Sequence, residues 1–183
     1  MRPRLQQRYI GDVLPELGTA HSIKNAMRLP RVTKVCLNMG VGKHHGDTKA
    51  LGQLVDDLTA ITGQKAVKAL SRTSEASFKI REGMPVGIRV TLRRQRMWEF
   101  LDRFINVAAP RIRDFRGFSR QGFDARGNYS FGIGEQSIFP EVNLDKMEAS
   151  QGMNITVVFE NSRPDISEHA LEMLGFPFER RKK

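Results

Sequence analysis

Residues 61–93 constrain the fold most, because they join two basic, strand-like runs through a loop rich in glycine, serine and arginine. In the second run, apolar side chains alternate with polar and basic ones: Ile88, Val90 and Leu92 against Arg89, Thr91 and Arg93. A strand with this period of two buries one face and exposes the other. The exposed face then carries cations and a hydroxyl, which suits contacts with phosphate and sugar.

Positive charge is concentrated in one part of the chain. The sequence holds 30 Lys and Arg against 20 Asp and Glu, a net charge of +10. Residues 65–126 alone hold 15 basic and 6 acidic residues. Such a local excess favours a polyanionic partner, since binding releases condensed counterions. Nucleic acid is the favoured partner, while an anionic membrane surface and a merely solvated basic face remain alternatives.

The size and composition of the chain indicate a globular protein. Its 183 residues, 39% of them hydrophobic, suffice for one well-cored domain or two small ones. No apolar run has the length of a membrane span, and residues 1–14 lack the apolar region of a signal peptide. The single cysteine, Cys36, excludes an internal disulfide and a cysteine-built zinc site. We therefore expect a cytoplasmic protein with no membrane partner.

The hydrophobic periodicity predicts an alternation of strands and helices along the chain. Strands are expected at 31–38, 65–70, 87–93 and 153–160, and helices at 4–17, 22–28, 48–62, 96–108 and 165–174. From residue 31 onward the order is β-α-β-β-α-β, which indicates an α+β split sandwich of the ferredoxin-like type. We expect a single domain over 1–183, with a helical extension at 1–30, a protruding loop at 71–85 and an irregular insertion at 111–152.

The predicted sheet has one apolar face and one polar face. Alternation turns these residues away from the helices: Lys34, Cys36, Asn38, Arg89, Thr91, Arg93, Asn154 and Thr156. An ordinary solvated face is the alternative. The choice of Asn, Thr and Arg over a Glu/Lys mixture favours a binding face. Because paired aromatic residues are missing from this face, recognition of RNA backbone and shape is favoured over base stacking.

Fragments that resemble enzyme motifs are incomplete. The segment GVGK at 40–43 follows a strand and precedes a helix, yet position 37 is Leu, and His44 stands where a phosphate-binding loop needs Ser or Thr. A tight turn whose amides approach an RNA phosphate is the better interpretation. His44, His45 and Asp47 lack a second pair of metal ligands, which favours a surface loop. We therefore expect no enzymatic activity, no metal and no cofactor.

Seven strings of the sequence resemble a known family in its own order. They are LPRVTKVCLNMGVG (29–42), ITGQKAVKA (61–69), FKIREGMPVGIRVTLR (78–93), MWEFLDRFINVAAPRIRDFRGFS (97–119), FDARGNYSFGIGEQSIFPE (123–141), GMNITVVF (152–159) and LEMLGFPF (171–178). Nearly end to end, the chain resembles the bacterial L5 family of large-subunit ribosomal proteins. The resemblance implies a structural protein of the ribosome that binds 5S rRNA in the central protuberance as a monomer. It also implies contacts with the large-subunit rRNA, with peptidyl-site tRNA and, across an intersubunit bridge, with a small-subunit protein of the S13 family.

The same resemblance implies that 5S rRNA contacts Asn38, Gln64, Lys65, Arg89, Thr91 and Arg93. The basic charge of the strands adds Lys34 and Lys68 to the expected RNA-binding residues. The tRNA contact is expected on the loop at 71–85, with Arg72, Ser74, Lys79 and Arg81. The bridge is expected within 117–141. An RNA chaperone or RNA-processing factor using the same basic surface is the alternative, which co-sedimentation with ribosomes would distinguish.

Overall fold

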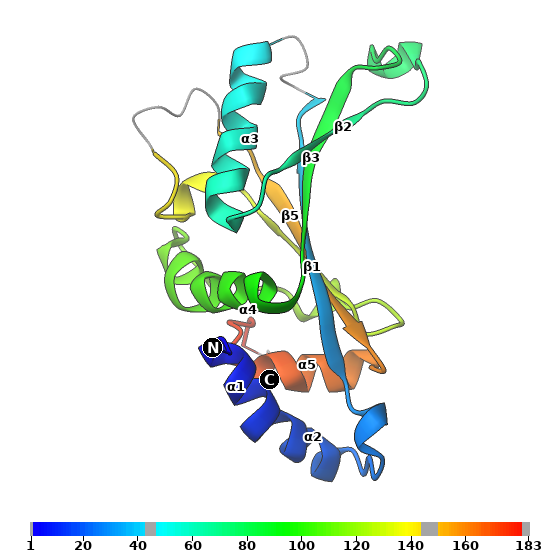
Figure 1. Cartoon of the computed structure of the whole chain (residues 1–183), viewed down its shortest axis with the longest axis vertical. Coiled ribbons are helices and arrows are strands. Elements are labelled where there is room, and N and C mark those ends of the chain that lie inside the picture. The colour runs from blue at the N-terminus through cyan, green and yellow to red at the C-terminus, as the bar shows by residue number, and fades with distance from the viewer. Residues whose placement is uncertain (1, 43–46, 144–149, 181–183) are drawn as a thin grey trace. The chain divides into compact units, whose positions relative to one another are not determined.

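The chain forms one five-stranded sheet with helices, seen here in a computed structural model that describes residues 2–42, 47–143 and 150–180 (Figure 1). The strands are β1 (Arg31–Gly40), β2 (Val67–Leu70), β3 (Pro85–Leu92), β4 (Tyr129–Ile133) and β5 (Met153–Glu160), and their order in the sheet is β2-β3-β1-β5-β4. The antiparallel pairing and the element order confirm the α+β split sandwich. His44 and His45 lie outside the described residues.

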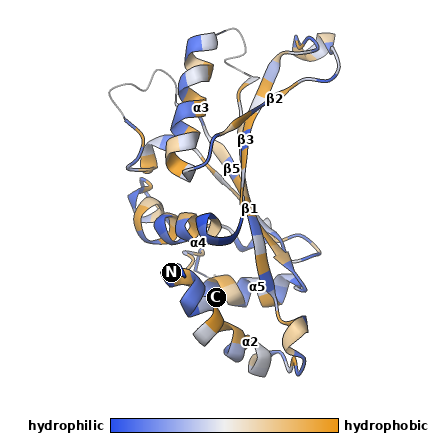
Figure 2. Cartoon of the chain, in the orientation of Figure 1, coloured by the Kyte–Doolittle hydropathy of each residue, from blue (hydrophilic) through white to orange (hydrophobic). Residues whose placement is uncertain are grey.

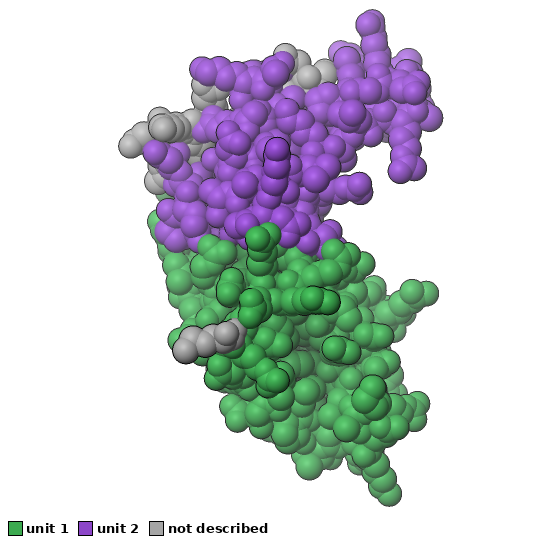
Figure 3. Space-filling view, viewed as in Figure 1, with its two compact units in different colours: residues 1–35, 92–131, 156–183 green, residues 36–91, 132–155 purple. Residues whose placement is uncertain are grey.

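Contacts divide the chain into two compact units, coloured separately in Figure 3. Unit 1 comprises residues 1–35, 92–131 and 156–183, and unit 2 comprises residues 36–91 and 132–155. Strands β1, β3, β4 and β5 each contribute residues to both units. The expectation of a single domain stays a prediction.

In unit 2, helix α3 (Thr48–Thr62) covers one face of its part of the sheet. The helix begins where Asp47 accepts hydrogen bonds from the amides of Lys49 and Ala50, and it ends at Gly63 in the left-handed conformation. Hydrophobic and hydrophilic residues mix along it (Figure 2), and the apolar stripe is buried: Leu51, Leu54, Leu58 and Ile61. Burial of this stripe holds the helix on the sheet.

Unit 1 holds the remaining helices and a core of aromatic rings. The helices are α1 (Arg4–Arg8), α2 (Leu14–Ala20), α4 (Arg94–Arg103) and α5 (Pro164–Met173), with π-helical turns at Tyr9–Val13 and Phe104–Ala108. The ring of Phe104 is fully buried, with centroids at 5.2 Å from Phe131, 5.7 Å from Phe118 and 6.0 Å from Phe176. Tilted rings at these separations pack favourably.

Two expectations about secondary structure were wrong. Within 22–28 only Ala26–Arg28 form a short 3-10 turn, because Ser22 adopts a positive φ and the Asn25 side chain accepts a hydrogen bond from the Met27 amide. The insertion at 111–152 contains strand β4, in which Tyr129, Phe131 and Ile133 are buried. Its exposed positions include Gly132, and glycine weakens the strand signal.

Gly117→Ala is expected to lower the free energy of unfolding by about 3 kcal/mol. Gly117 has a φ of +105°, and a Cβ there would lie 2.4 Å from the backbone nitrogen of Glu179 and 2.5 Å from the carbonyl carbon of Phe178. These atoms belong to backbone that pairs with Phe118, so they have little freedom to move. Urea unfolding measures the effect. Gly11→Ala, a helical site with no atom within 4 Å of the new Cβ, is the control and should not destabilise the protein. Equal losses for both variants would contradict this packing.

Candidate nucleic-acid interface

The face of the sheet that α3 leaves open in unit 2 carries short polar side chains on two neighbouring strands. On β1, Leu37 and Met39 are buried while Asn38 is exposed, and on β3, Ile88 and Val90 are buried while Arg89 is exposed. This is the alternation that the sequence predicts. It produces a polar face supported by a packed apolar one.

Asn38, Cys36 and Thr91 come together on this open face. The Thr91 hydroxyl lies 4.0 Å from the Cys36 sulfur, which puts the two residues opposite one another on β3 and β1. Gly87 allows a close approach of the two strands, because a Cβ on Gly87 would lie 3.5 Å from the amide oxygen of Asn38 and 3.3 Å from the carbonyl oxygen of Met39. The absence of a side chain on Gly87 therefore leaves the Asn38 amide close to the β3 backbone.

The turn after α3 brings Gln64 to the same place. The Gln64 side-chain amide donates to the Thr91 backbone carbonyl oxygen at 3.3 Å, and the Gln64 backbone carbonyl oxygen accepts from the Thr62 hydroxyl at 3.0 Å. Lys65 follows as an exposed cation, while Ala66 is buried and its amide donates to the Thr59 hydroxyl. The Thr hydroxyls thus fix the turn that presents Gln64 and Lys65.

Three of the predicted RNA-binding cations lie away from the group formed by Asn38, Gln64 and Thr91. Lys68 pairs with Ile88 in the β2–β3 register, whereas Val67 pairs with Arg89, so Lys68 projects from the opposite face of the sheet to Arg89. Lys34 and Arg93 belong to unit 1, where Lys34 is half-buried and Arg93 is exposed at the start of α4. The structure therefore groups Asn38, Gln64, Lys65, Arg89 and Thr91 and leaves these three cations outside the group.

Sequence reasoning missed Val67 on the open face. This side chain is 57% exposed and lies opposite Arg89. Only the strand register reveals this position, because the short run VKAL does not alternate clearly between apolar and polar residues. An exposed apolar side chain beside a cation can contact the apolar part of a sugar or base.

The loop between β2 and β3 is an ordered extension of the hairpin. The Ser71 amide donates to the Met84 carbonyl at 2.8 Å, Glu75 and Ile80 form an antiparallel bridge, and the Ser74 hydroxyl accepts from the Glu82 amide. The predicted tRNA-contact residues are all exposed: Arg72, Ser74, Lys79 and Arg81.

Phe78 is the second residue that sequence reasoning missed. It lies in a short 3-10 turn of this loop, next to Lys79 in the left-handed conformation, and is 73% exposed. An exposed aromatic residue among basic residues can stack on a nucleic-acid base. A large apolar residue within a polar loop was the available signal.

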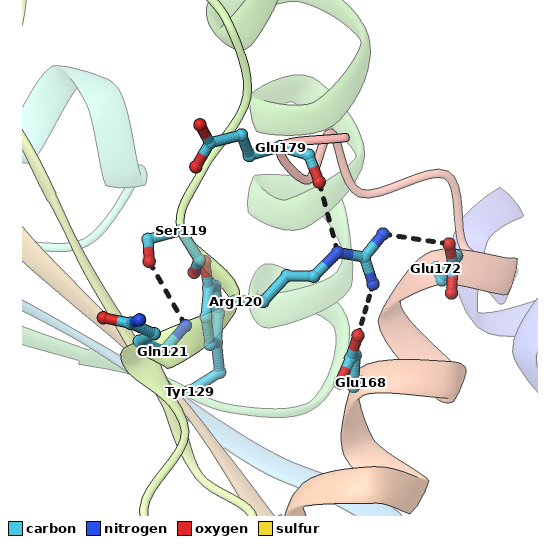
Figure 4. Close-up of polar contacts among 7 residues, drawn as sticks. All are labelled: Ser119, Arg120, Gln121, Tyr129, Glu168, Glu172 and Glu179. Carbon is cyan, nitrogen blue, oxygen red and sulfur yellow. Dashed lines mark hydrogen bonds and ion pairs between the residues drawn. The ribbon is translucent and has the colours of Figure 1, made fainter. Parts of the chain in front are cut away.

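Within the predicted bridge region, Arg120 serves the fold of unit 1 (Figure 4). Its guanidinium pairs with Glu168 and with Glu172 of α5, its Nε donates to the Glu179 carbonyl, and it lies over the ring of Phe178. The two carboxylates raise the pKa of Arg120. Because the Arg120 guanidinium is neutralised by Glu168 and Glu172, Arg120 adds little positive charge to a binding surface.

The described residues contain no cluster of possible metal ligands. No group of three or more possible metal ligands occurs among residues 2–42, 47–143 and 150–180. Asp47, which the sequence analysis assigned to a surface loop rather than to a metal site, accepts hydrogen bonds from the first amides of α3. Burial on α3 raises the pKa of the Asp57 carboxyl, and its hydrogen bond with Gln136 opposes this shift. In the part of the chain that the structure describes, no helix is long and apolar enough to cross a membrane.

An α+β sheet with one polar, basic open face is a surface typical of RNA-binding proteins that recognise backbone and shape. Residues 25–81 match the family described as "Ribosomal protein L5", and residues 85–178 match "ribosomal L5P family C-terminus". The chain belongs to the ribosomal L5 family of large-subunit ribosomal proteins. This confirms the resemblance read from the sequence.

Curated relatives match almost the whole chain. The "Large ribosomal subunit protein uL5" of Rhodopirellula baltica is 48% identical over 181 residues, covering 99% of this chain and 92% of that protein. The protein of the same name from Solidesulfovibrio magneticus is 49% identical over 177 residues, covering 97% and 99%. The Corynebacterium glutamicum protein is 50% identical over 176 residues, covering 96% and 92%. The chain is therefore similar in sequence to these proteins over almost their whole length.

Proposed function

We propose that the chain is a structural constituent of the large ribosomal subunit that anchors 5S rRNA through the open sheet face of unit 2. The observation that carries the proposal is the grouping of Asn38, Gln64 and Thr91 with the cations Lys65 and Arg89. Amides and a hydroxyl can hydrogen-bond ribose hydroxyls, while the cations neutralise phosphates. The packed apolar face beneath holds the group rigidly. Membership of the L5 family supports the same role.

The loop between β2 and β3 is the proposed contact with peptidyl-site tRNA. Its exposed cations Arg72, Lys79 and Arg81 suit phosphates, and exposed Phe78 suits a base. The segment 117–141 is the proposed source of an intersubunit bridge to a protein of the S13 family. Since Arg120 in this segment is paired internally, other residues of the segment make the bridge contact.

Binding to 5S rRNA is expected to weaken with salt, with a slope of log affinity against log salt of about −1.8. This value follows if Lys65 and Arg89, the two cations of the group, each neutralise a phosphate. Filter binding between 50 and 300 mM salt measures the slope. Arg89→Ala should make it less steep by about one phosphate, whereas Lys68→Ala is the control, because Lys68 projects from the other face. A flat salt response, or a larger effect of Lys68→Ala, would remove this mechanism.

A further inference from the structure

Unit 1 contains an apolar groove that lies outside both proposed RNA contacts. Its volume is about 860 Å³, and it is formed by the N-terminal helices, the start of β1 and the start of α4. Ile10 and Met27 both line it, and their side chains are 43% and 80% exposed. Exposed apolar side chains that gather in a hollow with a polar rim are typical of an interaction site.

The exposed position of Met27 is fixed by its backbone. The Met27 amide donates to the Asn25 side-chain oxygen at 2.9 Å, and the Met27 carbonyl oxygen accepts from the Asn161 side-chain amide at 3.0 Å. The main chain is therefore held on both sides while the side chain remains exposed. A fixed backbone lowers the entropy lost when a partner binds, and the unbranched methionine side chain adapts its shape to that partner.

The wall of the groove beside Ile10 is rigid. The neighbouring Tyr9 is buried, its hydroxyl donates to the Pro30 carbonyl oxygen at 2.8 Å, and its ring lies 5.1 Å from the ring of Trp98. Helix α1 packs against α4, which carries Trp98. Ile10 itself belongs to the π-helical turn Tyr9–Val13, and such turns occur frequently at functional sites. The groove is therefore formed before any partner arrives.

The rim of the groove is basic. Three arginines line it, Arg31, Arg93 and Arg94, against the single acid Glu160. All three arginines are exposed, and none of their side chains forms a hydrogen bond or ion pair with another described residue. These guanidinium groups are therefore available to carboxylates of a partner, which they can bind in paired hydrogen bonds.

An apolar lining with a basic rim suits an acidic amphipathic helix better than it suits RNA. The aliphatic side chains of Ile10, Leu14 and Met27 offer no hydrogen bond to ribose or phosphate and no ring on which a base can stack. They can receive the apolar stripe of a helix laid into the groove. Acidic residues on the flanks of that helix would then meet the arginines of the rim.

We propose that this groove, with Ile10 and Met27 inside it and arginines at its rim, binds an acidic amphipathic helix of a partner protein. All residues that line the groove belong to unit 1, whereas Asn38, Thr91 and the loop at 71–85 belong to unit 2. Protein binding and the proposed RNA binding are thereby assigned to different surfaces. The inference goes beyond the proposed function and does not rest on it.

Trp98 provides the signal for the test, because it is the only tryptophan of the chain and lines the groove. The full chain is titrated with a synthetic helical peptide that lacks tryptophan, carries leucine at i, i+3, i+4 and i+7, and carries glutamate on the flanks. Trp98 fluorescence reports binding. One control peptide has the same composition in scrambled order, and a second has lysine in place of glutamate.

Two double variants divide the apolar contribution from the charged one. Ile10→Ser/Met27→Ser is compared with Leu70→Ser/Val107→Ser, which alters two exposed apolar side chains outside the groove.

Arg31→Ala/Arg93→Ala is compared with Arg113→Ala/Arg116→Ala, which removes two exposed cations of unit 1 outside the groove. Urea unfolding of each variant checks that the fold is retained.

The Ile10/Met27 variant should bind the acidic peptide about tenfold more weakly, and the Arg31/Arg93 variant about threefold more weakly with less dependence on salt. Each control variant should stay within about twofold of the parent, and both control peptides should bind at least tenfold more weakly than the acidic helix. Saturating 5S rRNA should leave peptide affinity unchanged. Because the first titration contains no RNA, failure of the proposed 5S function leaves this result interpretable.

Several outcomes would overturn the proposal. Absence of peptide binding, equal binding of the scrambled peptide, or an unchanged affinity of the Ile10/Met27 variant would show that the groove does not recognise an amphipathic helix. Displacement of the peptide by 5S rRNA would make the groove part of an RNA site. Sedimentation of the parent as a dimer, with the Ile10/Met27 variant a monomer, would identify a second copy of the chain as the occupant.

Discussion

Replacing Asn38 and Thr91 together by alanine is expected to weaken 5S rRNA binding by about 100-fold while leaving the fold intact. Each side chain offers a hydrogen bond to RNA worth about 1–3 kcal/mol when its partner would be left unpaired. Neither holds the core: Asn38 is exposed, and the Thr91 hydroxyl has only a 4.0 Å contact with the Cys36 sulfur. Filter binding and thermal unfolding of the same protein measure the two effects.

Thr48→Ala provides the matched control for this double variant. Thr48 is an exposed hydroxyl residue of unit 2 at the start of α3, on the helix that covers the other face of the sheet. It should leave both RNA affinity and stability close to those of the parent. If the Asn38/Thr91 variant instead lost stability and binding in equal measure, these residues would support the sheet, and the RNA-binding face would lie elsewhere.

Shortening the loop from Arg72 to Gly83 to a Gly-Ser turn is expected to abolish most peptidyl-site tRNA retention on assembled ribosomes. The loop's hydrogen bonds are largely internal, such as the Glu75–Ile80 bridge and the pairing of Ser71 with Met84, so its removal leaves the group around Asn38 in place. Binding to 5S rRNA should therefore stay within about 1 kcal/mol of the parent. Filter binding of labelled tRNA to reconstituted ribosomes measures the loss.

Replacing Phe78 alone tests the stacking part of the proposed tRNA contact. Phe78→Ala should remove the base-stacking part of the tRNA contact, about 1–3 kcal/mol, without shortening the loop. Ser77→Ala is its neighbour control, because the Ser77 hydroxyl donates within the loop to Glu75. Unchanged tRNA retention in the shortened variant, or loss of 5S rRNA binding, would contradict the division of roles between loop and sheet.

The sequence predicts α3 and strands β1, β3 and β5 well, because the hydrophobic periodicity of these elements directly reflects which side chains are buried. The apolar stripe of α3 and the alternation along β1, β3 and β5 identify the buried residues. The same alternation predicts that Asn38 and Arg89 are exposed. The order β-α-β-β-α-β then limits the topology to few solutions, and the split sandwich is the one observed.

Features that depend on long-range pairing could not be predicted in the same way. The face on which Lys68 lies depends on the β2–β3 register, and four residues of β2 carry too little alternation to reveal it. Strand β4 is stabilised by pairing and by aromatic contacts of Tyr129 and Phe131 with the distant Phe176. A basic cavity of unit 1 is formed by three segments distant in sequence, 22–28, 125–126 and 159–166, so no local sequence pattern predicts it.

Cys36 gives the most direct test of the central claim that 5S rRNA covers the open sheet face. It is the only cysteine of the chain, and its sulfur lies beside Thr91 on that face, where it is half-buried. The rate of its modification by a small thiol reagent, methyl methanethiosulfonate, is measured by mass spectrometry for the native protein, free and with saturating 5S rRNA. The account predicts that 5S rRNA slows the reaction at least tenfold, while a noncognate RNA of equal length at the same concentration does not. Equal rates in the free protein and the 5S rRNA complex would contradict it.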